Sequence, residues 1–254
     1  MMKKFLQLST LPPKDLNKKK IKKETQKYIE IIQERQHILY AQSKHSILIV
    51  LQGMDAGGKD GAIKTVFSSV NPQGVSVACF KKPTALELSY DFLRRIHLEA
   101  PARGMIKIFN RSHYEDVLSP VVNKIIDKKE AKRRFDHINN FEKLLEENGT
   151  RILKFYLHIS EKEQAARFQE RLTNPLKQWK YNPSDKETAK QWPEYRKAYK
   201  DIFNNCNEIP WEIVPSDKNW YKEYLVAKKV AKTLLDLDLF FPTLAPLKTK
   251  KGKK

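Results

Sequence analysis

Glycines, a lysine and two aspartates gather in one short segment, Gly53-Met-Asp-Ala-Gly-Gly-Lys-Asp60. This segment follows the apolar run Ser46–Leu51, which is typical of a buried strand, and precedes the helix-like stretch Lys59–Val70. In a strand, turn and helix of this kind, glycine lets backbone N–H groups turn toward an anion, and the start of the helix adds partial positive charge. The spacing therefore predicts a phosphate-binding loop, with the residues Gly53, Gly57, Gly58, Lys59 and Gly61.

Two carboxylates distinguish this loop from the common phosphate-loop pattern. Asp60 stands where a serine or threonine normally offers its hydroxyl to magnesium, and Asp55 lies inside the loop. Two negative charges would repel a phosphate unless cations lie between them. We therefore expect a site loaded with Mg²⁺, or with Mn²⁺ in its place, and we expect Asp55, Lys59 and Asp60 to act in catalysis.

A second group of charged residues follows the third apolar run, in the segment Asn110-Arg-Ser-His-Tyr-Glu-Asp116. Ligands collect at the carboxyl ends of the strands in an open parallel sheet, so this segment is expected beside the phosphate loop. Arg111 would neutralise charge on a transferring phosphoryl group. Glu115 and Asp116 would complete a metal site together with an aspartate of the loop.

The same segment also fits a simpler structural interpretation. Ser112 would cap the start of a helix, and Glu115, three residues later, would close a capping box. Both interpretations hold at once, because a capped helix start also presents its acidic residues to the site. Lys81 and Lys82 end the second predicted strand and are expected at the same rim of the sheet.

Short apolar runs alternate along the chain with stretches of helical periodicity, which favours an α/β fold with a parallel five-stranded sheet and helices on both faces. The helix ending near Asn148 stops at Gly149, a plausible C-cap. The predicted strands are Ser46–Leu51, Val75–Phe80, Met105–Asn110, Arg151–Ile159 and Trp211–Val214, and the predicted helices are Asp15–Ala41, Lys59–Val70, Leu86–Leu98, Lys129–Asn148, Glu161–Leu172 and Tyr221–Leu235.

The region between Arg171 and Lys200 interrupts this alternation, with three prolines and basic residues placed among tryptophans and tyrosines. In a phosphate-loop kinase such a region forms a lid that closes over phosphates and excludes water. Two alternatives are a surface excursion whose aromatic side chains pack on the edge of the sheet, and a nucleic-acid-binding surface. The cations expected to act in the lid are Arg171, Lys177 and Lys180.

The composition favours a cytoplasmic protein, and its charge indicates either a polyanionic partner or a surface that is simply basic and solvated. The 254 residues include 49 lysines and arginines against 30 acidic residues, a formal net charge of +19. Cys79 and Cys206 lie far apart, so neither a disulfide framework nor a zinc site is indicated. No apolar stretch approaches the length that spans a bilayer, so no membrane partner is expected. We interpret the Lys-rich residues 246–254 as a basic tail.

Three segments together resemble the polyphosphate kinase 2 family: GMDAGGKDGAIK, then FKKPTALELSYDFLRRIHLEAPARGMIKIFNRSHYEDVL, then RFQERLTNPLKQWKYNPSD. The resemblance covers roughly residues 14–239. It implies a three-layer P-loop kinase-like core with a helical lid, and one domain over residues 1–254. Within that domain the N-terminal arm and helix would take about 1–45, the lid about 166–200 and the basic tail about 246–254.

The resemblance implies phosphoryl transfer between inorganic polyphosphate and a nucleotide, with magnesium. Asp55, Lys59 and Asp60 would act in the phosphate loop, and Arg111 at the transferring phosphate. Asn110 and Glu115 would bind nucleotide or phosphate, and the metal ligands would be Asp55, Glu115 and Asp116. Lys81, Lys82, Arg171, Lys177 and Lys180 would contact polyphosphate from the rim and the lid.

The SHYE stretch, with His113 and Glu115, is similar to the subgroup that phosphorylates both AMP and ADP. The expected partners are therefore inorganic polyphosphate and adenine or guanine nucleotides, with no nucleic acid, in a homodimer or homotetramer by family analogy. Two rivals remain at this point. One is an ATP-dependent nucleotide or small-molecule kinase of the same fold, and the other is a non-catalytic polyanion-binding module.

Overall fold

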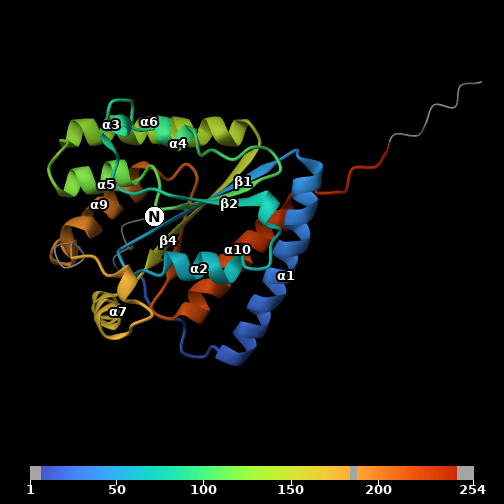
Figure 1. The fold of residues 1–254 in the computed structure, drawn as a ribbon, viewed down its shortest axis with the longest axis horizontal. Coiled ribbons are helices and arrows are strands. Elements are labelled where there is room, and N and C mark those ends of the chain that lie inside the picture. The colour runs from blue at the N-terminus through green and yellow to red at the C-terminus, as the bar shows by residue number, and fades with distance from the viewer. Residues whose placement is uncertain (1–6, 184–187, 245–254) are drawn as a thin grey trace, which may run out of the picture.

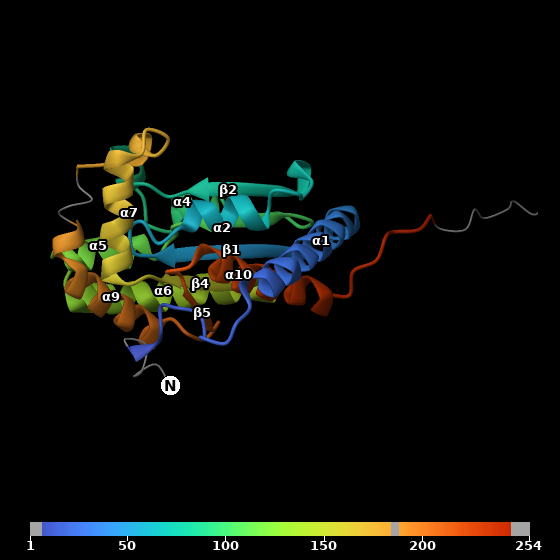
Figure 2. The same ribbon diagram turned by 90° about the horizontal axis from the view of Figure 1, so that it is seen from below.

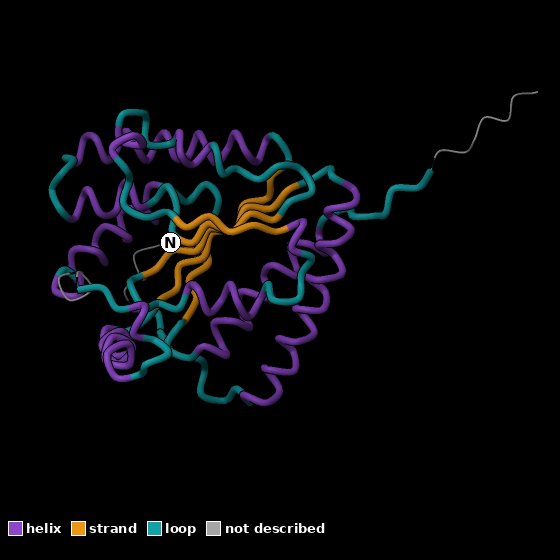
Figure 3. Tube along the Cα trace, in the orientation of Figure 1, coloured by secondary structure: helices purple, strands orange, loops and turns teal. Residues whose placement is uncertain are grey.

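In the computed structural model, which describes residues 7–183 and 188–244, five parallel strands form one sheet in the order β2-β3-β1-β4-β5. Figure 3 shows this sheet as a central band with helices on both sides. The α/β class with a parallel five-stranded sheet is therefore confirmed. The strands are β1 (Ser46–Gly53), β2 (Val75–Cys79), β3 (Ile106–Asn110), β4 (Thr150–His158) and β5 (Trp211–Pro215).

Each strand lies within two residues of its predicted bounds. In β1 and β4 the pattern is clear because buried parallel strands are apolar on both faces and so form continuous apolar runs in the sequence. Every residue of β1 is buried. Its side chains alternate between two cores: Leu48 and Val50 pack on one face of the sheet, and Ile47 and Ile49 pack on the other. The central strand is therefore fixed from both sides, and the loop that follows it starts from a rigid position.

Helices cover both faces of the sheet (Figure 1). One face carries α4 (Arg94–His97), α5 (Glu115–Val122), α6 (Lys128–Glu147) and α9 (Trp192–Asn205), whose buried residues include Phe141, Tyr199 and Phe203. The other face carries α1 (Lys18–Gln42), α2 (Lys59–Val66) and α10 (Asn219–Asp236), with α1 and α10 side by side. The remaining elements are η2 (Pro72–Gly74), α3 (Ala85–Leu88), α7 (Glu161–Thr173) and η3 (Gln178–Lys180).

The structure corrects two helix predictions. The stretch Leu86–Leu98 forms two short helices, because Thr84 and Glu87 make a capping box for the first and the Asp91 carboxylate accepts the backbone N–H of Leu93 ahead of the second. The helix predicted over Lys59–Val70 ends at Val66. The lid region after Arg171, expected to be helical, contains η3 and the start of α9, and Pro193 is tolerated because it lies in the first turn of α9.

The predicted stop at Gly149 is confirmed. Gly149 follows the end of α6 with a φ of +88°, and its N–H donates to the carbonyl of Glu146 at 3.0 Å. Glycine reaches this left-handed conformation without strain, so α6 turns directly into β4.

The predicted subdivisions stay predictions, and two of them contain the following elements. The arm and helix of 1–45 contain α1, and the lid of 166–200 contains most of α7, η3 and the start of α9. Figure 2 shows α7 at the end of the sheet toward which the strand arrows point. The basic tail of 246–254 lies outside the described residues. None of the helices in residues 7–183 and 188–244 is long and apolar enough to cross a membrane.

A buried charged cluster ties β4 and α6 to the turn at the start of α5. Lys154 on β4 donates to the Glu142 carboxylate of α6 at 2.7 Å and to the Tyr114 hydroxyl at 2.9 Å. The Tyr114 hydroxyl and the His113 ring contact the other Glu142 oxygen at 2.7 and 3.1 Å. Burial disfavours the charged Glu142 carboxylate, but Lys154 and His113 outweigh that effect and lower its pKa.

Removing one member of this cluster should destabilise the protein strongly. Lys154→Met leaves the Glu142 carboxylate buried without its cation, which should lower the free energy of unfolding by about 3–5 kcal/mol in urea denaturation. The double variant Glu142→Gln/Lys154→Met should recover most of this loss, because no buried charge remains. Lys143→Ala, which breaks only an exposed pair with Glu147, is the control. A loss below about 1 kcal/mol for Lys154→Met would contradict a buried charged pair.

Candidate phosphate-binding site

The phosphate loop joins β1 to α2 at the carboxyl edge of the sheet (Figure 1). Gly53 lies beside Leu157 of β4, and a Cβ at Gly53 would stand 2.8 Å from the Leu157 carbonyl oxygen. Gly58 has a φ of +91°, which carries the chain into α2 in a left-handed conformation. These two glycines are therefore required by close approach and by backbone geometry, and the predicted loop has the expected strand and helix around it.

Four carbonyl groups of the loop accept hydrogen bonds from side chains, one from Lys59 of the loop itself and three from helices α7 and α10. Lys59 Nζ donates to the Gly53 carbonyl at 3.0 Å, and Gln164 of α7 donates to the Asp55 carbonyl at 2.8 Å. The other two bonds run from Arg167 to Ala56 at 2.8 Å and from Lys222 to Gly58 at 2.9 Å. These bonds occupy the carbonyl groups of the loop, while the first N–H groups of α2 have no intrahelical acceptor. We call the side of the loop that these N–H groups face its mouth. This arrangement suits an anion.

Lys59 lies at the centre of this arrangement and is buried. Burial and the nearby Arg111 guanidinium lower its pKa to about 8, although Asp55 and Glu115 act in the opposite direction. A phosphate arriving beside Lys59 would favour its charged form.

Arg111 lies between two carboxylates. One of its nitrogens donates to Glu115 Oε2 at 3.1 Å, and another pairs with Asp55 Oδ1 in the loop. Glu115 above all, and also Asp55, raise the pKa of the guanidinium against the effect of burial. The backbone of Arg111 has a φ of +65°, a conformation that a non-glycine residue adopts only where its surroundings impose it. The structure thus brings Asp55, Arg111 and Glu115 together, as expected.

Asp60 points from the first turn of α2 toward Asn110 and the lid. Asn110 donates to Asp60 Oδ1 at 2.9 Å, and Lys180 donates to Oδ2 at 2.7 Å. Burial opposes ionisation of Asp60, but the hydrogen bonds from Lys180 and Asn110 prevail and lower its pKa. The predicted residues Asp60, Asn110 and Lys180 therefore meet at one point on the edge of the loop.

Asp116 is turned away from the loop, unlike its neighbour Glu115. Its carboxylate pairs with Arg95 at 3.0 Å, and its backbone carbonyl accepts from Arg134 at 2.9 Å. Burial raises the pKa of Asp116 in spite of these cations. The expected grouping of Asp116 with Asp55 is therefore corrected, because Arg95 of α4 offers Asp116 a closer cation.

The predicted capping box at Ser112 is also wrong. The Ser112 hydroxyl accepts from the Tyr114 N–H at 3.3 Å, and the N–H of Glu115 donates to the Ser112 carbonyl instead. In the orientation that satisfies its amide, Gln52 of β1 accepts from the Ser112 hydroxyl and donates to Glu115 Oε1, both at 3.0 Å. Glu115 is thus engaged by Gln52 and Arg111 rather than by the helix start.

The other predicted cations lie around the rim. Lys81 and Lys82 are exposed at the end of β2. Lys177 pairs with Glu170 within the lid at 2.6 Å, and Arg171 Nη1 donates to the Lys180 carbonyl at 3.5 Å. Only Lys180 of these five reaches the phosphate loop in an ion pair within the described part of the chain.

The carboxylates of the site fit a magnesium ion that is held mainly by substrate. The described residues contain no cluster of three or more His, Cys, Asp or Glu side chains able to hold a metal ion. Magnesium is commonly bound by one or two carboxylates together with substrate phosphates and water, and not by a cage of protein ligands. Asp55 and Glu115, both at Arg111, supply such oxygen ligands at the mouth of the loop.

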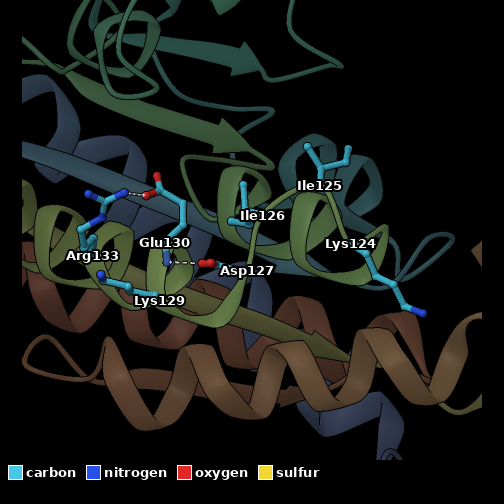
Figure 4. A pocket seen from close by; sticks show the side chains of 7 residues that line it. All are labelled: Lys124, Ile125, Ile126, Asp127, Lys129, Glu130 and Arg133. Carbon is cyan, nitrogen blue, oxygen red and sulfur yellow. Dashed lines mark hydrogen bonds and ion pairs between the residues drawn. The ribbon is translucent and has the colours of Figure 1, made fainter.

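Two cavities lie near α6. The cavity in Figure 4, of about 470 Å³, is lined by residues 124–127, 129, 130 and 133 and includes no residue of the phosphate loop. The other, of about 590 Å³, includes Arg95 and Asp116 and so borders the site through the neighbour of Glu115.

Four residues that hold the site were not predicted from the sequence: Gln52, Gln164, Arg167 and Lys222. Gln164 and Arg167 lie on α7, and Lys222 lies on α10, far from the loop in the sequence. One signal was available, since polar residues at buried positions of amphipathic helices often have a partner in the fold. The partners of Gln164, Arg167 and Lys222 are backbone carbonyls, which leave no mark in the sequence, and Gln52 meets the side chains of Ser112 and Glu115.

Comparison with known proteins identifies relatives along nearly the whole chain. Residues 14–238 match the family described as Polyphosphate kinase 2. The AMP/ADP-polyphosphate phosphotransferase of Meiothermus ruber is 46% identical over 213 residues, covering 83% of this chain and 80% of its own. The ADP-polyphosphate phosphotransferase of Rhodopseudomonas palustris is 39% identical over 236 residues, covering 87% and 82%.

A solved structure agrees with these sequence matches. The crystal structure of polyphosphate kinase 2 from Arthrobacter aurescens TC1 has a TM-score of 0.89 and 38% sequence identity, and the match covers 93% of this chain and 85% of that one.

The Lys180–Asp60 pair should hold the lid against the loop. Both side chains are partly exposed, so the pair should contribute about 0–1 kcal/mol. Lys180→Met should therefore speed chymotrypsin cleavage at the exposed Trp179 by about two- to fivefold. Lys82→Met, which removes an exposed rim lysine, is the control. Equal cleavage of Lys180→Met and wild type would show that the pair does not restrain the lid.

Proposed function

Because this chain belongs to the polyphosphate kinase 2 family, we propose that it transfers a terminal phosphoryl group between inorganic polyphosphate and nucleotides, with AMP and ADP as acceptors. The observation that supports this most is the phosphate loop with buried Lys59, set beside an arginine that lies between two carboxylates. These groups suit the binding and transfer of phosphate.

The chemistry requires charge neutralisation more than proton removal. The acceptor oxygen of AMP or ADP belongs to a phosphate and is already anionic, so no general base is needed to deprotonate it. The obstacle is repulsion between two anions, which the positive charges of Lys59 and Arg111 offset. We therefore infer direct in-line transfer, with no phosphorylated protein residue. His113 fits this inference, because it is buried against Glu142 and does not face the loop.

Asp55 and Glu115 would hold the divalent metal, Mg²⁺ or Mn²⁺. When bound, the metal supplies positive charge between the phosphate oxygens and the carboxylates. Arg111 contacts both carboxylates, so the protein keeps their charge balanced around the transferring group. Asp60, paired with Asn110 and Lys180, would orient the first turn of α2 and the lid toward the same phosphates.

Polyphosphate would lie along the basic rim and under the lid. A formal charge of +19 favours a long polyanion, with counterion release adding to affinity by analogy with nucleic acids. The cations proposed to contact it are Lys81, Lys82, Arg171, Lys177 and Lys180.

The names of two relatives bear on the nucleotide acceptors. The Meiothermus ruber relative, named for both AMP and ADP, supports those acceptors, and a relative from Corynebacterium glutamicum named putative GDP-polyphosphate phosphotransferase supports guanine nucleotides as an alternative. Assembly as a homodimer or homotetramer belongs to the same proposal, and sedimentation would test it.

Product analysis tests the activity directly. Protein mixed with Mg²⁺, long-chain polyphosphate and AMP, without ATP, should form both ADP and ATP. Lys59→Met and Arg111→Lys should each lower kcat by at least about 100-fold, because each removes charge stabilisation at the transferring group. Lys64→Met, on the exposed side of α2, is the matched control. Formation of ATP from ADP but nothing from AMP would overturn the AMP assignment alone, and turnover only with ATP as donor would overturn the polyphosphate donor.

Removal of the metal provides a second test. EDTA should abolish turnover, and added Mg²⁺ should restore it. Asp55→Asn should raise the Mg²⁺ concentration for half-maximal activity by about tenfold or more, because a neutral amide is a poorer magnesium ligand than a carboxylate. Direct titration with Mn²⁺, followed by electron paramagnetic resonance, should show the same weakening. Unchanged Mn²⁺ affinity would exclude Asp55 as a ligand.

A further inference from the structure

Lys222 of α10 is a buried cation without a buried anion beside it. Its side chain is 0% exposed, and its Nζ donates to two neutral oxygens, the Gly58 carbonyl at 2.9 Å and Asn219 Oδ1 at 3.0 Å. In residues 7–183 and 188–244, no carboxylate lies within ion-pairing distance of it. Buried charges in proteins are normally paired, because removing an ammonium from water is costly.

The surroundings of Lys222 make its charge less favourable still. Burial and the guanidinium of Arg167 lower its pKa to about 8, against weaker opposing effects of Glu223 and Asp60. Among the described residues, the carboxylate nearest to this pair of cations, Glu163, is bonded to Arg167 at 3.0 Å and not to Lys222. A lysine in this position is a poor choice for stability alone, since an apolar side chain of the same length would avoid the desolvation cost.

The ammonium lies directly behind the phosphate loop. A Cβ at Gly58 would stand 2.4 Å from Lys222 Nζ, so only glycine leaves room for it. The carbonyl that Lys222 contacts belongs to the peptide unit joining Gly58 to Lys59, whose N–H is at the start of α2. A cation on the carbonyl of an amide polarises the whole unit and strengthens its N–H as a donor. Through this one peptide unit, the charge of Lys222 makes the N–H at the start of α2 a stronger donor at the mouth of the loop.

We propose that Lys222 is a positioning residue for phosphoryl transfer, and that its missing counter-charge is the phosphate bound in the loop. The inference rests on the proposed function, because it takes the bound anion to be a phosphoryl group of polyphosphate or nucleotide. Lys222 acts through Gly58: it holds the carbonyl away from the mouth and adds positive charge behind the N–H groups that receive the phosphate. The free protein is destabilised by this buried charge, and binding of the anion compensates for it.

This role and a purely structural one predict opposite effects of the same substitution. If Lys222 serves stability, Lys222→Met lowers the melting temperature. If its counter-charge is the substrate, Lys222→Met removes an uncompensated charge, and the Gly58 carbonyl still accepts the Ala62 N–H at 3.1 Å. The ligand-free protein then keeps or gains thermal stability while its affinity for phosphate falls. Lys222→Gln separates hydrogen bonding from charge, because the amide still donates to the Gly58 carbonyl but carries no charge.

The experiment compares wild type, Lys222→Met, Lys222→Gln and Lys229→Met. Lys229 lies on the same helix and pairs with Glu212 near the surface, which makes it the matched control. The melting temperature is measured with and without tripolyphosphate and Mg²⁺, and the affinity for tripolyphosphate is measured by calorimetry. We expect both Lys222 variants to melt at or above the wild-type temperature without ligand, and to bind tripolyphosphate about ten- to a hundredfold more weakly. Lys229→Met should match wild type in both measurements.

Three results would overturn the inference: wild-type affinity in Lys222→Met, wild-type affinity in Lys222→Gln, or a fall in ligand-free melting temperature in both variants. The second would show that the hydrogen bond, and not the charge, is what the loop requires. The proposed function is judged separately by the wild type. If wild-type protein binds no tripolyphosphate, the proposed function itself fails, whereas binding that the variants share equally removes only the role of Lys222.

Discussion

The site depends on one constraint: the loop after β1 must present N–H groups at its mouth, so its carbonyl groups need partners elsewhere. Gly53, Asp55, Ala56 and Gly58 each give their carbonyl oxygen to a side chain, and three of those side chains come from α7 and α10. An unpaired buried carbonyl is costly, so these contacts decide which way the loop faces. The loop is therefore a property of the assembled sheet and its helices.

The second requirement is that opposite charges alternate closely around the mouth. Arg111 lies between Asp55 and Glu115, and Asp60 lies between Asn110 and Lys180. Each carboxylate thus has a donor beside it, which allows acidic residues to line a site for anions. The strained backbone of Arg111, with its positive φ, is the local cost of pointing its side chain back across the loop.

The segment 111–116 is held in place by contacts on its core side. His113 and Tyr114 point into the core and meet Glu142 and Lys154, while Arg111 and Glu115 point to the loop. Neighbouring residues of this short turn therefore point to different surroundings, some into the core and some to the phosphate loop. Because the buried cluster joins α5, α6 and β4, a shift in any of these elements would move the residues that face the phosphate.

The sequence by itself determined the strands, the glycine-rich loop and the charged segment after β3, because buried parallel strands and phosphate loops have local patterns that survive without knowledge of the fold. It did not determine that Asp116 faces Arg95 while Glu115 faces Arg111, since both acidic residues occupy adjacent positions of the same pattern. Nor did it reveal the bounds of α9 in the lid region or the partners of Gln164, Arg167 and Lys222. The tertiary structure decided these, because backbone carbonyls and long-range ion pairs become neighbours only when the sheet and its helices are packed together.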